Sequence, residues 1–231
     1  MIMKRSQINQ IQDNALKLFN EYRISLPPFV FWSVEEWKQK SEEVAEIKDN
    51  LLGWDITDFG SGDFFKMGLL LITLRNGNQK DIKKYSKPYA EKLMLVQEEQ
   101  VTPMHFHWSK MEDIINRGGG NLMITLYNSN EDESFAQSDV IVSLDGVKNV
   151  FSAGETIRLY PGQSITLTQG LYHKFWAEKG KGPVIVAEVS MCNDDNKDNR
   201  FYEPVGRFPD IEEDEAPRYL LCSEYERWIN K

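Results

Sequence analysis

Short strand-like segments separated by glycine-centred turns run through most of the chain, and they constrain the fold more than any other feature. From Trp54 onward, apolar runs of strand length alternate with turn signals at Asn76-Gly77, Asp145-Gly146, Pro161-Gly162 and Gln169-Gly170. Asn-Gly and Asp-Gly pairs favour the tight turns that join neighbouring antiparallel strands. No long helical segment and no glycine-rich phosphate loop interrupts the series. The pattern predicts an all-β sandwich or barrel.

Two helical segments precede these strands, and an acidic tail follows them. Apolar residues recur at helical spacing across residues 6–23, and Ser33 followed by Glu36 forms a capping-box pattern that opens a second helix ending near Gly53. The tail is acidic but rich in aromatic side chains, which need a surface to pack against. A length of 231 residues suits one domain. We therefore expect a single domain over residues 1–231, with a helical extension (1–53), a β-core (54–192) and a tail (193–231) folded back over the core.

The net charge and the cysteines limit which partners and which cellular compartment we expect. A formal net charge of −9 argues against nucleic acid or an anionic membrane as the main partner, because both would repel the chain. No apolar stretch approaches the roughly 20 residues needed to cross a bilayer, and the polar N-terminus does not read as a signal peptide. Cys192 and Cys222 do not form a disulfide framework, so we expect reduced thiols and a cytoplasmic location.

The histidines are few and closely spaced. The chain has 3 histidines, and His105 and His107 would face the same side of a β-strand because alternate residues do. Glu112 follows five residues later, and His173 lies in a second strand-like stretch that could pair with the first. Three imidazoles and one carboxylate suit Mn, Fe, Co, Ni or Zn and leave coordination positions for substrate. Ordinary barrel-facing or surface histidines are the alternative, and the i, i+2 spacing argues against it.

These four residues carry a resemblance to the cupin family. His105, His107, Glu112 and Gly119 match the first cupin motif, H-x-H-x(3,4)-E-x6-G, and Gly162, Gly170 and His173 match the second. Glu99, Thr168 and Ala177 replace the usual glycine, proline and asparagine. The substitutions affect turn geometry and a position that is not a ligand. The resemblance implies a double-stranded jelly roll with a metal ion held by three histidines and one glutamate.

Two longer stretches narrow the resemblance. HFHWSKMEDIINRGGGNL and the tail EPVGRFPDIEEDEAPRYLLCSEY, together with the helical N-terminus, resemble the D-lyxose isomerase family of cupin sugar isomerases. That family implies interconversion of D-lyxose with D-xylulose, and of D-mannose with D-fructose. It also implies Mn²⁺ as the first choice of metal, with Co²⁺, Fe²⁺ and Zn²⁺ suited to the same ligands, a small sugar as the partner, and a homodimer.

Such an isomerisation moves a proton between C1 and C2 of the sugar. A divalent metal that binds both O1 and O2 can act as a Lewis acid, so we favour a cis-enediolate route over a hydride shift. Glu203, held between Tyr202 and Pro204, is the first candidate for the base. Glu188 is the rival, because an acid within the apolar strand PVIVAEVSMC needs a partner. Each could instead have a structural or solvated role.

Further polar side chains complete the expected site. Lys110 has the parity to enter the same pocket as Glu112, where its ammonium could stabilise the enediolate or move a proton between O1 and O2. A surface lysine in a short turn is the alternative. Glu188, Asp194 and Arg207 are expected to bind sugar hydroxyls.

Two other functions fit the same ligand set. A metal-dependent cupin dioxygenase uses three histidines and one glutamate, and a non-catalytic sugar-binding cupin would retain the metal without turnover. A sensor of the second kind usually carries a DNA-binding module, and the acidic chain has no basic helix-turn-helix candidate.

Overall fold

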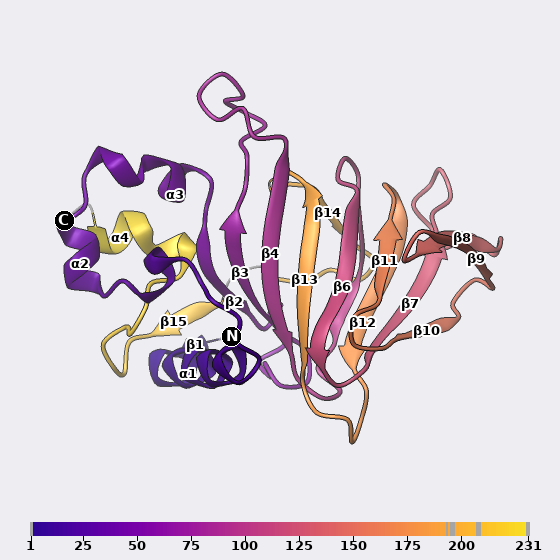
Figure 1. The fold of residues 1–231 in the computed structure, drawn as a ribbon, viewed down its shortest axis with the longest axis horizontal. Helices are drawn as coiled ribbons and strands as arrows, with labels where there is room; N and C mark the ends of the chain where they lie inside the picture. The colour runs from indigo at the N-terminus through magenta and orange to yellow at the C-terminus, as the bar shows by residue number, and fades with distance from the viewer. Residues whose placement is uncertain (1, 193, 195–196, 207–208, 230–231) are drawn as a thin grey trace.

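Two facing β-sheets form the body of the protein, and helices gather at one end of it (Figure 1). This computed structural model describes residues 2–192, 194, 197–206 and 209–229. The strands of the two sheets are β2 (Gly53–Thr57), β3 (Leu69–Arg75), β4 (Tyr89–Val96), β5 (Thr102–His107), β6 (Glu112–Gly119), β7 (Leu122–Asn128), β8 (Val140–Leu144), β9 (Val147–Phe151), β10 (Thr156–Leu159), β11 (Ser164–Leu167), β12 (Leu171–Ala177), β13 (Val184–Met191) and β14 (Asn199–Phe201).

The strand order is that of a jelly roll. The eight-stranded sheet runs β2-β3-β4-β13-β6-β11-β8-β9, and the five-stranded sheet runs β10-β7-β12-β5-β14. Neighbouring strands within both sheets are antiparallel. Each sheet keeps two edge strands, so the body is a two-layered jelly roll and not a closed barrel. The predicted all-β jelly-roll class is confirmed.

The main hydrophobic core lies between the two sheets. Ile114 and Val186 point inward from the eight-stranded sheet, and Leu126 and Phe175 face them from the five-stranded sheet. Alternate residues of a strand face opposite sides, so one face of each strand supplies this core. Burying one such side chain contributes about 1.5–3 kcal/mol. The core holds the two sheets in fixed register around the polar cavity described below.

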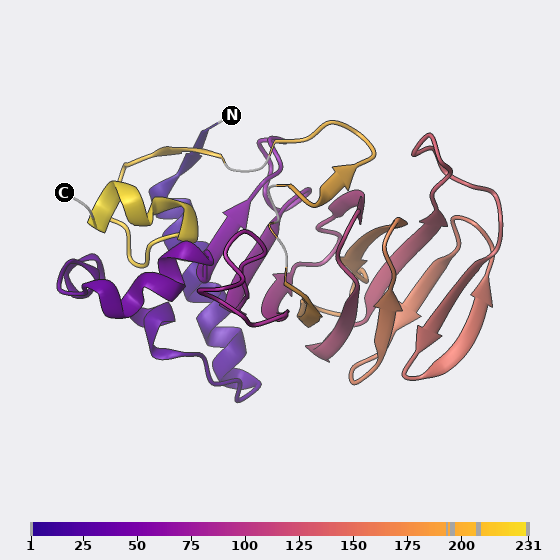
Figure 2. The ribbon, with the colours of Figure 1, turned by 90° about the horizontal axis from the view of Figure 1, so that it is seen from above.

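The outer face of the eight-stranded sheet carries the helical extension, as the view from above shows (Figure 2). The predicted first helix is confirmed, and its residues Ile8 and Phe19 pack with Ile72 and Ile185 of the sheet. With 17 residues it is the longest helix, and within the described ranges no helix is long and apolar enough to cross a membrane. The helices and 3₁₀ helices are α1 (Arg5–Glu21), η1 (Pro28–Phe31), α2 (Val34–Lys38), η2 (Glu42–Val44), α3 (Ala45–Asp49), η3 (Cys222–Glu224) and α4 (Tyr225–Ile229).

The predicted second helix is wrong in its length. Its capping box is present, with Glu36 N donating to Ser33 Oγ and Ser33 N donating to Glu36 Oε2. The helix then stops, and α2, η2 and α3 replace one continuous helix. At the first break Ser41 has φ −121° and ψ −139°, and Glu43 Oε2 accepts from both the Ser41 amide and its hydroxyl. These local side-chain bonds compete with helical ones.

One tight turn follows the prediction closely, and another does not. Asp145 (φ 50°) and Gly146 (φ 83°) form the two-residue turn between β8 and β9, as expected for a pair that needs positive φ at both positions. Asn76-Gly77 ends β3, but the next strand begins at Tyr89. A longer loop therefore joins β3 to β4.

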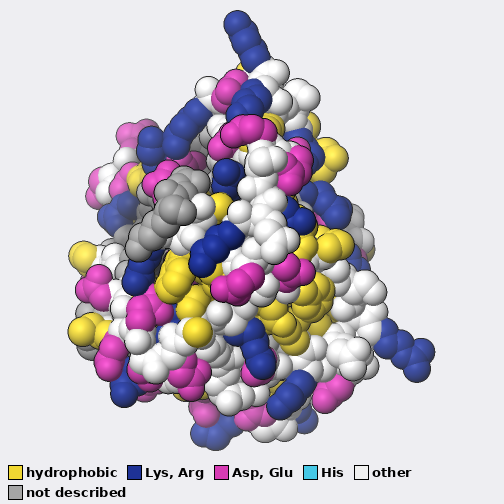
Figure 3. Space-filling model, turned by 90° about the vertical axis from the view of Figure 1, so that its left-hand side faces the viewer, with side chains coloured by type: hydrophobic (Ala, Val, Ile, Leu, Met, Phe, Trp, Pro, Cys, Tyr) yellow, Lys and Arg dark blue, Asp and Glu magenta, His cyan; other side chains and the backbone are white. Residues whose placement is uncertain are grey.

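The tail folds back in two parts. β14 pairs with β5 at the edge of the five-stranded sheet, which agrees with the predicted cover over the core. The rest turns toward the helical end, where β15 (Asp210–Glu212) pairs with β1 (Ile2–Lys4). Tyr225 of α4 lies 4.5 Å from Trp37 of α2, measured between ring centroids. The aromatic residues of the tail thus pack partly on the sheets and partly on the helices. On the surface of this end, charged side chains of both signs surround smaller hydrophobic patches (Figure 3).

Candidate active site

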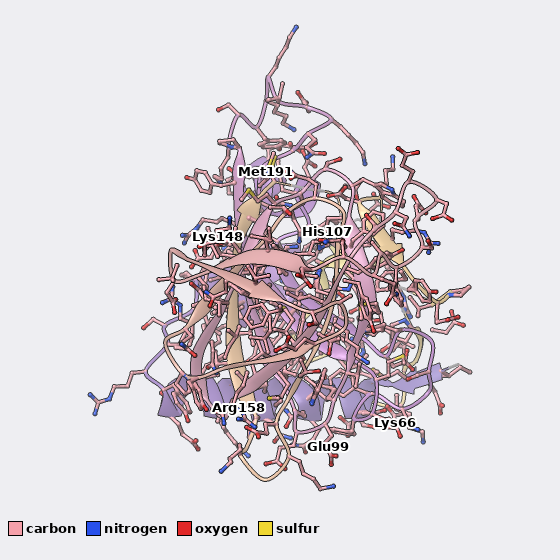
Figure 4. All side chains as sticks on the ribbon, turned by 90° about the vertical axis from the view of Figure 1, so that its right-hand side faces the viewer. Lys66, Glu99, His107, Lys148, Arg158 and Met191 are labelled. Atoms are coloured by element: carbon pink, nitrogen blue, oxygen red, sulfur yellow. The ribbon has the colours of Figure 1, made fainter. Side chains whose placement is uncertain are left out.

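A polar cavity lies between the two sheets, beside the hydrophobic core. His107 lies in the interior, nearer to the end of the molecule that carries Met191 than to the end with Lys66 and Glu99 (Figure 4). The apolar side chains of the lining are those of Phe59, Leu69, Leu71, Met94, Ile114, Phe175 and Phe201. The titratable ones are Lys92, His105, His107, Lys110, Glu112, His173 and Glu188. The cavity therefore joins apolar walls to a dense group of charged and imidazole side chains.

Two neighbouring strands bring the three histidines together. His105 and His107 alternate along β5, and His173 of β12 pairs directly with His105. One nitrogen from each of the three rings lies within 4.8 Å of the others. The centroids of His105 and His173 are 4.1 Å apart. The i, i+2 spacing and the antiparallel pairing thus place three buried imidazoles in one cluster.

Backbone carbonyls fix the tautomer of each ring. Nδ1 of His105 lies 2.7 Å from the carbonyl oxygen of Pro103, and Nδ1 of His173 lies 3.0 Å from that of Leu171. Nδ1 of His107 lies 3.2 Å from the Asp198 carbonyl. A carbonyl only accepts, so each Nδ1 carries a proton, and a neutral ring in this tautomer presents a lone pair at Nε2. Burial first, and the neighbouring His173 and His107 next, lower the pKa of His105 well below its ordinary value, which keeps that ring neutral.

Glu112 completes a set of donors that needs a cation. Its Oε1 lies 3.3 Å from His107 Nε2 and 3.2 Å from His173 Nε2, and among the described residues this oxygen accepts no hydrogen bond. Burial acts to raise the pKa of Glu112, but Lys110, His107 and His173 together lower it by more, so the pKa lies well below its ordinary value. Lone pairs of a carboxylate and two imidazoles then face one another. A divalent cation would relieve that repulsion, so these residues fit a metal.

A chain of charges extends from Glu112 across the cavity. Lys110 Nζ lies 2.6 Å from Glu112 Oε2 and 2.9 Å from Glu188 Oε1. Glu188 Oε1 also lies 3.3 Å from Lys92 Nζ and accepts from Ser190 Oγ at 2.8 Å. All four charged side chains of this chain are buried. Lys110 and Glu188, both predicted from strand parity, therefore lie within hydrogen-bonding distance in the cavity.

Lys92 is a site residue that the sequence predictions missed. It stands opposite Glu188 in the pairing of β4 with β13 and is 2% exposed. The signal was present, because Lys92 shares strand parity with Met94 and Val96, which both belong to the core between the sheets. A lysine on the core face of an apolar strand requires a carboxylate partner.

The remaining predicted residues lie elsewhere. Glu203 follows β14 and is exposed, and Asp194 bonds Lys80 at 2.7 Å near the surface. Among the described residues that line the cavity, neither is present. Arg207 falls outside the described residues. Because a base must reach a sugar inside the cavity, this placement favours Glu188 over Glu203, the reverse of the order predicted from the sequence.

β14 forms one wall of the cavity and was not predicted as part of the site. Asn199 pairs with His107, and Phe201 pairs with His105. The ring of Phe201 lies 5.3 Å from that of His105, measured between centroids. Both Asn199 and Phe201 line the cavity. The tail therefore contributes apolar and amide groups to the site, but through β14 and not through Glu203.

Comparison with known proteins identifies the family. Residues 3–225 match the sequence profile of the D-lyxose isomerase family. The D-lyxose/D-mannose isomerase of Serratia proteamaculans is 50% identical over 228 residues, which cover 98% of this chain and 100% of that protein. The D-lyxose/D-mannose isomerase of Escherichia coli O157:H7 is also 50% identical, over 230 residues that cover 98% of this chain and 100% of that protein.

Solved structures of sugar isomerases share the fold. The L-ribose isomerase of Cellulomonas parahominis without ligand has a TM-score of 0.61 at 16% identity, over 91% of this chain and 99% of that one. The L-ribose isomerase of Acinetobacter sp. DL28 in complex with L-ribose has a TM-score of 0.59 at 13% identity, over 91% and 98% of the two chains. At these identities the likeness concerns the fold alone. The near-complete profile match and the 50% identical relatives show that the chain belongs to the D-lyxose isomerase family and is an aldose-ketose isomerase.

Proposed function

We propose that this isomerase interconverts D-lyxose with D-xylulose, and D-mannose with D-fructose, in a reaction that depends on a divalent metal. The 50% identity to proteins named D-lyxose/D-mannose isomerases, over essentially the whole chain, supports the substrates. D-Lyxose and D-mannose have the same configuration at C2, C3 and C4, so a site that recognises those three centres would accept both sugars. Membership of an isomerase family argues against the two alternative functions, a cupin dioxygenase and a non-catalytic sugar-binding cupin.

The observation that carries the metal proposal is Glu112 Oε1, which accepts no hydrogen bond among the described residues and faces the Nε2 atoms of His107 and His173. The residues that would hold the ion are His105, His107 and His173 through Nε2, and Glu112 through Oε1. Mn²⁺ is our first choice, and Co²⁺, Fe²⁺ and Zn²⁺ suit the same donors. When bound, the ion would supply Lewis-acid polarisation of the sugar oxygens O1 and O2.

Glu188 is the proposed base that moves the proton between C1 and C2. It contacts Lys92, Lys110 and Ser190 through Oε1, and in this proposal its carboxylate takes the C–H proton of a substrate. Its placement in the cavity lining supports this role over the exposed Glu203.

Lys110 is the proposed electrostatic partner of the developing enediolate. Its ammonium lies between Glu112 and Glu188, so it can donate to O1 or O2 as negative charge grows there. It can also carry a proton between the two oxygens. With Glu188 acting on carbon and Lys110 on oxygen, the residues favour a cis-enediolate over a direct hydride shift.

The experiment is an isomerase assay on a panel of pentoses and hexoses in deuterated buffer. Metal-loaded protein should convert D-lyxose and D-mannose and incorporate solvent deuterium at C1 of the ketose or C2 of the aldose. Complete retention of the substrate hydrogen across many turnovers would contradict the enediolate. Failure to convert either sugar while a different aldose is isomerised would contradict the substrate proposal.

A further proposal concerns the oligomeric state and the cellular location of the protein. We propose a cytoplasmic homodimer, on the family resemblance and on the two cysteines, Cys192 and Cys222, which are both free thiols. Light scattering coupled to gel filtration should give twice the chain mass of 26.9 kDa. A mass equal to one chain at micromolar concentration would contradict the dimer.

A further inference from the structure

The connection between β5 and β6 determines where Lys110 can reach. Residues 108–111 join the strand that ends at His107 to the strand that begins at Glu112. Lys110 lies inside this connection and is 2% exposed, with its ammonium between two carboxylates. A small displacement of the Lys110 backbone would therefore move the ammonium relative to Glu112 and Glu188 together.

Asp198 binds the backbone of that connection directly. Its Oδ1 accepts from the Ser109 amide at 2.8 Å, and its Oδ2 accepts from the Lys110 amide at 3.0 Å. Asp198 is 6% exposed, and its own carbonyl accepts from His107 Nδ1 at 3.2 Å. The two carboxylate oxygens thus hold two successive amides, while the backbone of the same residue holds a histidine of the metal cluster.

Other groups hold the carbonyls of the connection and carry no charge. Within the described residues, the carbonyls of His107, Ser109 and Met111 accept from the Gly170 amide, Gln169 Nε2 and the Met191 amide. Asp198 is the one carboxylate among these partners, and it binds two successive amides of the connection.

We propose that Asp198 is a positioning residue that acts through Lys110. It holds the Ser109 and Lys110 amides so that the Lys110 ammonium stays between Glu112 and Glu188 during turnover. The proposal rests on the proposed isomerase function of the same site. It assigns a role to a residue of the tail that does not itself line the cavity.

The Asp198→Asn variant separates this role from a general structural one. The new side-chain NH₂ group would face one of the two backbone amides, so one hydrogen bond is lost and the connection shifts. The Asp198 backbone carbonyl is retained, so His107 keeps its partner and the metal site is preserved. A displacement of about 1 Å can cost on the order of 100-fold in rate. We expect kcat on D-lyxose to fall about 10- to 100-fold, with KM and the dissociation constant of Mn²⁺ changed less than threefold.

A double-mutant cycle with Lys110→Gln tests the connection. If Asp198 acts through Lys110, Asp198→Asn should lower kcat no further in a protein that already carries Lys110→Gln. The matched control is Asp145→Asn, because Asp145 Oδ1 likewise accepts from a backbone amide, that of Ser164 at 2.8 Å, but lies in the turn between β8 and β9. Its small effect should multiply with that of Lys110→Gln.

The outcomes distinguish the two proposals. Mn²⁺ affinity is measured by titrating metal-free protein and watching the melting temperature, which needs no turnover. Multiplicative losses in the double variant, or normal kcat in a folded Asp198→Asn protein, would overturn the positioning role. An unmutated protein that turns over neither D-lyxose nor D-mannose would instead overturn the proposed function. If Asp198→Asn does not fold, Asp198→Ser, which keeps one acceptor without an amide nitrogen, replaces it in the same cycle.

Discussion

One cluster of charged side chains lies at the helical end and another lies in the cavity between the sheets, and their hydrogen bonding differs. At the helical end, Arg5 of α1 is fully buried and donates to both oxygens of Glu213 and both oxygens of Glu224. Each acceptor of that cluster has a donor. In the cavity between the sheets, Glu112 Oε1 has none among the described residues.

The difference shows what each cluster is built to do. A buried charge that is fully paired holds segments together, because every desolvated group has recovered its hydrogen bonds. The Arg5 cluster joins the first helix to two parts of the tail. A buried oxygen without a donor beside imidazole lone pairs is unfavourable, so it persists where a bound ion completes it. The following predictions test that distinction.

The largest effect is expected from the histidine cluster. His107→Ala should lower kcat/KM on D-lyxose by at least about 10³-fold, since one of the four proposed metal donors is lost. Metal content measured on the purified variant should fall well below one ion per chain. If the variant kept one metal ion per chain and normal activity, the cavity would not be the reactive site.

The next largest effect is expected from Glu188, the proposed base. Glu188→Gln keeps the shape of the side chain but removes the carboxylate, and general acid–base catalysis is worth about 10²- to 10⁴-fold. We expect kcat to fall within that range while one metal ion per chain is retained. Single-turnover kinetics with C2-deuterated D-lyxose measure the step directly. A loss of metal equal to the loss of activity would show that Glu188 only supports the ion.

The paired cluster should behave in the opposite way. Arg5→Met leaves Glu213 and Glu224 without their guanidinium, and breaking a buried pair by removing one partner costs about 3–5 kcal/mol. Urea unfolding should report that loss in the free energy of unfolding. Turnover per folded molecule should stay within about twofold, because Arg5 lies outside the cavity lining. A specific loss of kcat would mean that the two clusters are not separate in function.

The smallest effect is expected from Glu203→Gln. Glu203 is exposed and lies outside the cavity lining, so kcat and KM on D-lyxose should change less than about twofold. Steady-state kinetics beside Glu188→Gln provide the measurement. If Glu203→Gln lowered kcat more than Glu188→Gln does, Glu203 in the tail would be the base, as the sequence alone suggested.

The histidine cluster and the strands were predictable because their signals are local. Alternation along β5 and the i, i+2 spacing of His105 and His107 need no knowledge of the rest of the fold. Parity within one strand also pointed to Lys110 and Glu188. The Asp145-Gly146 hairpin is a further case, since two adjacent residues specify it.

The residues whose position or role was not predicted depend on contacts between distant segments. Whether Glu203 enters the cavity depends on where the tail turns away after β14, and the apolar surfaces of the helices decide that. Lys92 was missed because its partner, Glu188, comes from a strand almost a hundred residues later. Asp198 was missed because its role is to bind backbone amides, which leave no mark on side-chain patterns. The break at Ser41 arose from a local bond that helical periodicity does not report.

The account depends most directly on a divalent ion held by His105, His107, His173 and Glu112. The measurement is a titration of chelator-stripped protein with Mn²⁺, followed at each step by conversion of D-lyxose to D-xylulose. We predict no turnover without metal and a linear rise that ends at one ion per chain. Equal turnover by the stripped and the reloaded protein would contradict the account.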